Sequence, residues 1–407
     1  MENQVFSKFG EGIRVTVLNI VLVASAFVWY FLFFNFLRNT MDLLVLSSDA
    51  ILKILGLNFF SLIFSALSGS FLVERFWDKV RFLYFWMLLG AFLSLSLLHG
   101  FSGLLDVLVL SVAFGAYFGF GMPVIMGYYA STTSVFNRSK IGGTIFLVIS
   151  LCSFIFSIVI IGNPDILALL LMSIQLAGLF IFYMLKPKTV DMHEGTSVRF
   201  SSILLSRPFI LYFLPWCMFS LVNYIVIPVL SKLFSEGEAF VRFYSMIENV
   251  LVAAFAFAGG FLADAFGRKR LAMIGFALVG FGYAILGLAQ NIVGWYLYTV
   301  IDGTAWGIFF VLFFFTVWGD LAEGRSSEKY YAVGVMPYLS SNFMRLLLEP
   351  YVSLIPTTAL FSFASVFLFA AVLPLVYAPE TLPESVIRER QLKSYIEKAK
   401  KFKEKYS

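Results

Sequence analysis

The sequence has few charged residues and few of the cysteines and histidines that bind metals. Only 13% of its 407 residues are Asp, Glu, Lys or Arg, whereas soluble domains carry about 25%. The two cysteines, Cys152 and Cys217, lie inside apolar stretches, which argues against a disulfide framework and a thiolate metal site. The two histidines, His99 and His193, lack metal-ligand spacing. We expect neither a metal nor a cofactor.

Two further absences narrow the class of protein. No G-x-x-x-x-G-K-[ST] phosphate loop is present, so the sequence encodes no nucleotide-driven motor of its own. No cluster of acids or histidines suggests a catalytic site, and we expect the protein not to be an enzyme. The net charge of +5 lies in loops and in the C-terminal tail, which suits an anionic membrane surface and not nucleic acid.

Apolar residues dominate instead, at 60% of the chain. Crossing a bilayer takes about 20 apolar residues in a helix, and twelve runs of about that length occur. They cover 14–37, 50–73, 80–98, 103–127, 141–161, 166–185, 201–230, 239–263, 271–288, 292–318, 331–354 and 359–377. The fold class predicted is therefore all-α integral membrane, with 12 transmembrane helices.

The polar segments divide these runs into two groups of six. We expect a first six-helix bundle over 1–185, a cytoplasmic linker over 186–200 and a second bundle over 201–378. Most of the 29 Lys and Arg fall on one side if both termini are cytoplasmic, which predicts that orientation in the cell membrane. Residues 379–407 form a basic amphipathic pattern that suits either contact with membrane lipids or a solvated helix.

One polar turn occurs twice, half a chain apart. The turn at 259–270 carries glycines, one acid and three bases between apolar runs, and the turn at 69–79 matches it in the first half of the chain. Glu74 stands opposite Asp264, and Lys79 stands opposite Lys269. Two related copies at this spacing predict a duplicated bundle.

These features together resemble the major facilitator superfamily. The family's motif between spans 8 and 9 has glycine, acid, glycine and bases where this chain has Gly260, Asp264, Gly267, Arg268 and Lys269. The copy around Glu74 lacks the glycines, and Pro379-Glu380-Thr381 is similar to a common ending of the family's last span.

The resemblance implies an alternating-access carrier in which each half is an inverted pair of three-helix units. It implies that Asp264 latches the cytoplasmic side against the start of span 5 at Gly142 and Gly143, and that Glu74 does so opposite span 11. The alternative is a tight turn that only orients the protein by its charge. The signatures of drug antiporters and sugar porters, after spans 5 and 6, are missing.

Ionisable groups inside a membrane are costly and are therefore functional candidates. Glu248, Asp302 and Arg345 lie within predicted spans, and Asn58 occupies the position of Glu248 in the first half. One interpretation makes Glu248 and Asp302 a proton or substrate-cation site, with Arg345 binding an anionic group or holding a carboxylate charged. The other makes the three a structural ion-pair network.

We therefore predict a secondary active transporter for a small organic solute, coupled to protons and monomeric. An uncoupled uniporter is the alternative within transport. A transport-inactive receptor or sensor and a lipid-handling membrane enzyme are the alternatives from other classes.

Overall fold

The computed structural model describes residues 2–76, 78–99, 103–160, 163–187, 197–223, 229, 237–352 and 354–383, with 388, 392, 395 and 396 in the tail. Side chains at 2–10, 74–76, 157–160, 237–244 and 342 are outside this description. Within the described residues the regular elements are helices, and ten of them are long and apolar enough to cross a membrane. The protein is a multi-pass membrane protein of the all-α class.

The helices of the first half follow the predicted runs closely. They are α1 (Glu2–Leu43), α2 (Ser48–Phe76), α3 (Lys79–Ser94) with the 3-10 turn η1 (Leu95–His99), α4 (Leu104–Thr132), α5 (Arg138–Ile160) and α6 (Pro164–Met184). Their starts have clear local causes. Asp78 accepts a hydrogen bond from Val80 N, and Asn163 caps the helix that opens with Pro164, because the first helical N–H groups need an external acceptor.

The second half contains more and shorter elements. They are α7 (Phe200–Leu204), α8 (Arg207–Val222), α10 (Gly237–Phe266), α11 (Arg268–Leu288), α12 (Ile292–Phe310), the π-helical η3 (Val311–Thr316), α13 (Val317–Ala322), α14 (Ser327–Gly334), α15 (Met336–Val352), α16 (Thr357–Ala370) and α17 (Val372–Tyr377).

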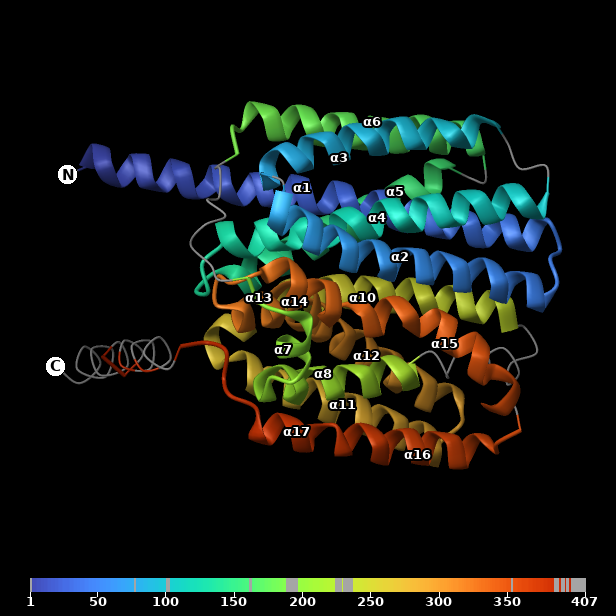
Figure 1. Ribbon diagram of the computed structural model, residues 1–407. Helices are drawn as coiled ribbons and strands as arrows, with labels where there is room; N and C mark the ends of the chain where they lie inside the picture. Colours follow the sequence, from blue (N-terminus) through green and yellow to red (C-terminus); the bar gives the residue numbers. More distant parts are fainter. Residues whose placement is uncertain are drawn as a thin grey trace.

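The two groups of helices lie one above the other in Figure 1. Helices α1–α6 fill the upper part and α7–α17 the lower part, and α2 and α5 face α15 and α10 where the groups meet. We call this contact the seam. The start of α1 and the end of α17 lie at the left of Figure 1, and we call that end the inner end, because it is the end predicted to face the cytoplasm.

The duplication predicted from the repeated turn also appears in the positions where helices end. Helix α2 ends at Phe76 and α10 ends at Phe266, which is the same offset along the chain as from Glu74 to Asp264. Helix α4 ends at Thr132, and the continuous α12–η3–α13 segment ends at Ala322, again at that offset. The packing repeats as well, since α2 packs on α4 as α10 packs on α12, and α3 packs on α6 as α11 packs on α16.

Two predicted spans are interrupted. The run at 201–230 begins as the short helix α7 and restarts at Arg207, where Ser206 caps α8. Residues 224–228 and 230 lie outside the description. The run at 331–354 is divided at Val335 between α14 and α15, because Pro337 supplies no backbone N–H. The start predicted at 201 lies within one residue of α7, whereas α14 begins four residues before the predicted 331.

Close backbone contact holds α2 and α4 together. A Cβ at Gly115 of α4 would lie 2.7 Å from the carbonyl oxygen of Asn58 on α2. Small residues at such crossings let transmembrane helices approach closely, which is the main source of their attraction in lipid.

We expect Gly115→Val to destabilise the protein by about 1–3 kcal/mol, because the added methyl groups overpack this crossing. A thermal unfolding curve of the purified protein measures the effect. Gly12→Val in α1 is the matched control, since a Cβ at Gly12 meets nothing within 4 Å. Equal unfolding temperatures for the two variants would contradict close packing at Gly115.

Candidate functional site

Asp264 lies at the seam near the inner end of α10. Its Oδ2 accepts a hydrogen bond from Lys140 N at 3.2 Å, at the start of α5, and its Oδ1 is 3.1 Å from Arg268 Nη2. One turn earlier, a Cβ at Gly260 would lie 2.5 Å from Ser139 O. The structure thus places Asp264 against the first turn of α5. Gly142 and Gly143 lie farther along α5, against Phe315 and α10.

A second acid, Asp320, completes this contact. Its Oδ1 is 2.5 Å from Arg138 Nη1 of the first half, and its Oδ2 is 3.2 Å from Arg268 Nε of the second half. The side chain of Asp320 is 1% exposed, and that of Arg268 is fully buried. Arg268 Nη2 also donates to Val135 O. One carboxylate therefore joins guanidinium groups from both halves, and we call Asp264, Arg138, Arg268 and Asp320 the latch.

The sequence motif has a further partner at its second glycine. Gly267 has φ +100 and precedes α11, a conformation that favours glycine. The Glu380 carboxylate accepts hydrogen bonds from Arg268 N at 2.8 Å and from Lys269 N at 3.2 Å. An anion at a helix N-terminus satisfies free N–H groups and faces the positive end of the helix dipole. Thr381 Oγ1 donates to Asp320 Oδ2 at 3.1 Å, so the segment after α17 is tied to the latch.

The other copy of the motif makes a different contact. Lys79 Nζ is 2.6 Å from Glu328 Oε1, with the two side chains 12% and 2% exposed. Glu328 lies in the first turn of α14 and follows Arg138 at the offset that relates Glu74 to Asp264, so Glu328 and Arg138 occupy related places while their ion-pair partners differ. The side chain of Glu74 is outside the described residues, and its role as a latch acid stays a prediction.

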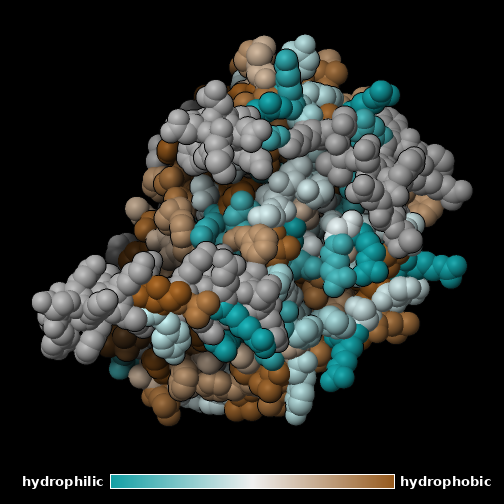
Figure 2. All heavy atoms as spheres, turned by 90° about the vertical axis from the view of Figure 1, so that its left-hand side faces the viewer, coloured by the Kyte–Doolittle hydropathy of each residue, from teal (hydrophilic) through white to brown (hydrophobic). Residues whose placement is uncertain are grey.

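Figure 2 shows the inner end face-on, with hydrophilic side chains gathered on it. The latch lies beneath this surface because its charged groups are buried.

The structure brings Glu248 and Asp302 together. Their carboxyl groups face each other, and Tyr298 lies beside Asp302. Asp302 is 2% exposed, and its Oδ1 has no hydrogen-bond partner. The pair lies where α10 packs on α12. Glu248 is twelve residues before the seam-facing Gly260, or roughly 120° around the helix, so the pair lies beside the seam, within the second half.

Asn58 takes the matching place in the first half. Its Nδ2 donates to Ser111 O of α4 at 2.7 Å, and its Oδ1 accepts from Tyr30 Oη of α1 at 3.2 Å. An amide that bonds two neighbouring helices is a common device in membrane bundles. Arg345 is half-buried on α15, a helix that packs on α2 and α8. The roles of Asn58 and Arg345 in transport stay predictions.

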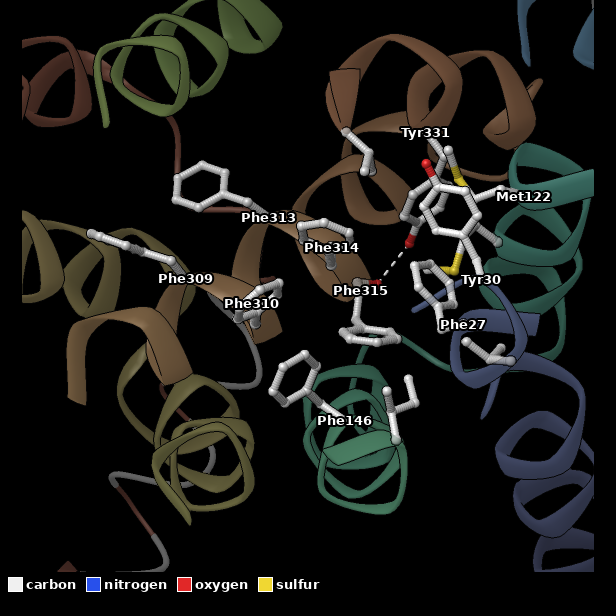
Figure 3. Packing of buried hydrophobic residues seen from close by; sticks show 14 of the residues in the cluster. Phe27, Tyr30, Met122, Phe146, Phe309, Phe310, Phe313, Phe314, Phe315 and Tyr331 are labelled. Atoms are coloured by element: carbon white, nitrogen blue, oxygen red, sulfur yellow. Dashed lines mark hydrogen bonds between the residues drawn. The ribbon is translucent and has the colours of Figure 1, made fainter. Parts of the chain in front are cut away.

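Aromatic rings fill the middle of the seam. Six of them form what we call the aromatic layer: Phe27, Phe146, Trp216, Phe310, Phe314 and Tyr338. Phe146 stacks on Phe310 at 4.3 Å, and Phe27 meets Phe314 edge-on at 6.1 Å, which joins the two halves. Figure 3 shows Phe310, at the end of α12, and Phe314 and Phe315 of η3 on the side of span 10 that faces Phe27 and Phe146.

The π-turn that presents these rings was missed from the sequence. A π-turn leaves carbonyls displaced from their usual partners, and here side chains take them up. Trp318 Nε1 donates to Phe313 O at 2.5 Å, and Tyr331 Oη donates to Phe315 O at 2.6 Å. The only sequence signal was the run of adjacent phenylalanines in span 10, which does not distinguish a π-turn from an α-helix.

We expect Asp320→Asn to lower stability by about 3–5 kcal/mol, because two buried guanidiniums lose their shared counter-ion. The loosened latch should also expose a Ser139→Cys thiol, buried at the start of α5, to a membrane-impermeant maleimide added from the inner side. Thermal unfolding and labelling rate measure the two effects. Glu323→Gln is the control, because Glu323 and Arg325 form an exposed ion pair, which contributes little. If both variants behave alike, the latch does not hold the inner end shut.

No protein-family model matches the sequence, and no curated protein is similar to it in sequence. Solved structures are similar in fold. The proton:xylose symporter XylE bound to 6-bromo-6-deoxy-D-glucose superposes with a TM-score of 0.71 at 14% identity, covering 91% of this chain and 96% of that one. The human organic anion transporter MFSD10 superposes with a TM-score of 0.64 at 13% identity, covering 89% of this chain and 99% of that one. FucP in the outward conformation superposes with a TM-score of 0.70 at 11% identity, again covering 89% of this chain and 99% of that one. The chain has the fold of the major facilitator superfamily of transporters.

Proposed function

We propose that this protein is a secondary transporter that moves a small organic solute across the cell membrane by alternating access, coupled to protons. The fold supports the transport part, because the similar structures include a proton:xylose symporter and an organic anion transporter. Because the sugar-porter and drug-antiporter signatures are missing, the sequence does not indicate the solute class, and the residues at the seam have to supply that argument.

The latch and the aromatic layer support alternating access. Charges are paired across the seam at the inner end, and aromatic rings close its middle. A path closed on the inner side is one of the two states that a rocking carrier needs. The other state requires Asp320 to release Arg138, so that the inner end opens and water reaches the separated charges.

The contact between Glu248 and Asp302 is the observation that supports proton coupling. Two carboxyl groups that face each other favour a state in which one of them holds a proton, because two adjacent carboxylates repel. This contact lies inside the membrane-spanning part, between the helix that bears Asp264 and the helix that leads into η3. A proton gained or lost there changes the α10–α12 packing, which is connected to both the latch and the aromatic layer.

Glu248→Gln and Asp302→Asn should each abolish solute-driven proton movement, because an amide cannot exchange a proton. Proteoliposomes loaded with a pH-sensitive dye report internal pH as panels of sugars, organic anions and neutral aromatic compounds are added. Asp49→Asn is the control, since Asp49 forms an exposed ion pair with Lys53.

Three outcomes would contradict parts of this proposal. Wild-type proton movement in both variants would exclude the pair as the proton site. Solute uptake without proton movement in the unmodified protein would indicate a uniporter. Solute binding without uptake would indicate a receptor or sensor.

A further inference from the structure

Two polar groups at the aromatic layer have no partner. Trp216 Nε1 and Ser220 Oγ are both buried, and neither makes a hydrogen bond in this closed state. They lie one turn apart on α8, and so on one face of that helix. Thr299 and Ser94, also inside membrane helices, donate to carbonyl oxygens one turn earlier. Buried donors are rarely left unpaired, and those that are call for a functional explanation.

The surroundings of Trp216 are rings. Its indole stacks on Phe313 at 4.8 Å with the planes 9° apart, meets Phe314 edge-on, and lies 6.3 Å from Tyr338. Through Phe310 and Phe314 these rings reach Phe146 and Phe27 of the first half. Opening the seam at this level would therefore expose aromatic faces and two hydrogen-bond donors.

The charged groups lie elsewhere in the described part of the chain. The latch is at the inner end, and the Glu248–Asp302 pair is between α10 and α12. Arg345 is the exception to consider, because it lies seven residues after Tyr338 on α15, or about two turns along the same face. Arg345 would favour an anionic solute, whereas the layer itself offers no charge to balance one.

We propose that the transported solute is an uncharged, largely apolar molecule with at least one ring and a hydrogen-bond acceptor. Its rings take the place of layer rings when the seam parts, and its acceptor receives hydrogen bonds from Trp216 Nε1 and Ser220 Oγ. This inference rests on the proposed transport function and names the class of solute for it. A bare sugar has too little apolar surface for the layer, and an anion lacks a counter-charge there.

Benzophenone is a suitable probe, because it has two rings, one carbonyl acceptor and no charge, and light crosslinks it to neighbouring residues. Purified protein in lipid nanodiscs is irradiated with benzophenone, and the labelled residues are mapped by mass spectrometry. We expect saturable labelling of the aromatic layer that falls about tenfold in Trp216→Phe/Ser220→Ala, since two hydrogen bonds are lost. Labelling of the exposed Phe64 and Phe180 should be unchanged and serves as the internal control.

Two further compounds test whether the solute is instead an anion or a sugar. Benzophenone-4-carboxylate has the same rings with a negative charge, and D-xylose has acceptors without rings. The proposal is overturned if the carboxylate labels the layer more strongly than benzophenone, if excess D-xylose blocks labelling, or if the double variant is labelled like the unmodified protein. An absence of saturable labelling in the layer overturns it too.

Thermal unfolding keeps the result interpretable. The two donors make no hydrogen bond here, so the double variant should remain folded, with an unfolding temperature lowered only by the smaller ring at position 216. If the double variant does not fold, Trp216→Phe and Ser220→Ala are tested singly, and each should weaken labelling. Labelling needs no pH gradient, so a failure of proton coupling would leave this result standing, and the reverse also holds.

Discussion

The contact between the two halves at the inner end is centred on one buried carboxylate. Asp320 is the shared counter-ion of Arg138 and Arg268, which come from opposite halves and are themselves buried. A guanidinium keeps its charge in proteins, so separating the halves leaves charges that only water can stabilise. The inner end is therefore either tightly paired or open and hydrated. Glu380 and Thr381 extend this constraint to the segment after the last helix.

The two halves share the positions of their helices but differ in their charged residues. The C-terminal boundaries of α2 and α4 recur in the second half at one constant offset, yet the inner end is held by Asp320 on one side and by Lys79 with Glu328 on the other. The amide of Asn58 bonds neighbouring helices in the first half, whereas Glu248 meets a second acid in the same place of the other half. At this pair of related positions the first half thus has an amide where the second half has an acid.

Between these charged sites, the aromatic layer makes the middle of the seam apolar. Dispersion and ring packing hold it together, so no ion pair has to break for its rings to separate, as the proposed exchange with a solute ring requires. The π-turn directs nearby phenylalanines to different sides of span 10, with Phe313 toward Trp216 and Phe315 toward Phe27. The seam is apolar in its middle, and its polar groups lie within the halves or at the inner end.

The sequence by itself determined the all-α membrane class, the helical runs and the repeat, because apolar length and turn residues are local properties of the chain. It also singled out Asp264, Glu248 and Asp302, since a lone charge in an apolar run is visible without a structure. Only the tertiary structure revealed Asp320, Glu380 and the pairing of Lys79 with Glu328, whose partners are far apart in the chain. The unpartnered donors of Trp216 and Ser220 also depend on it, because a hydrogen bond is absent or present only relative to neighbours that folding brings close.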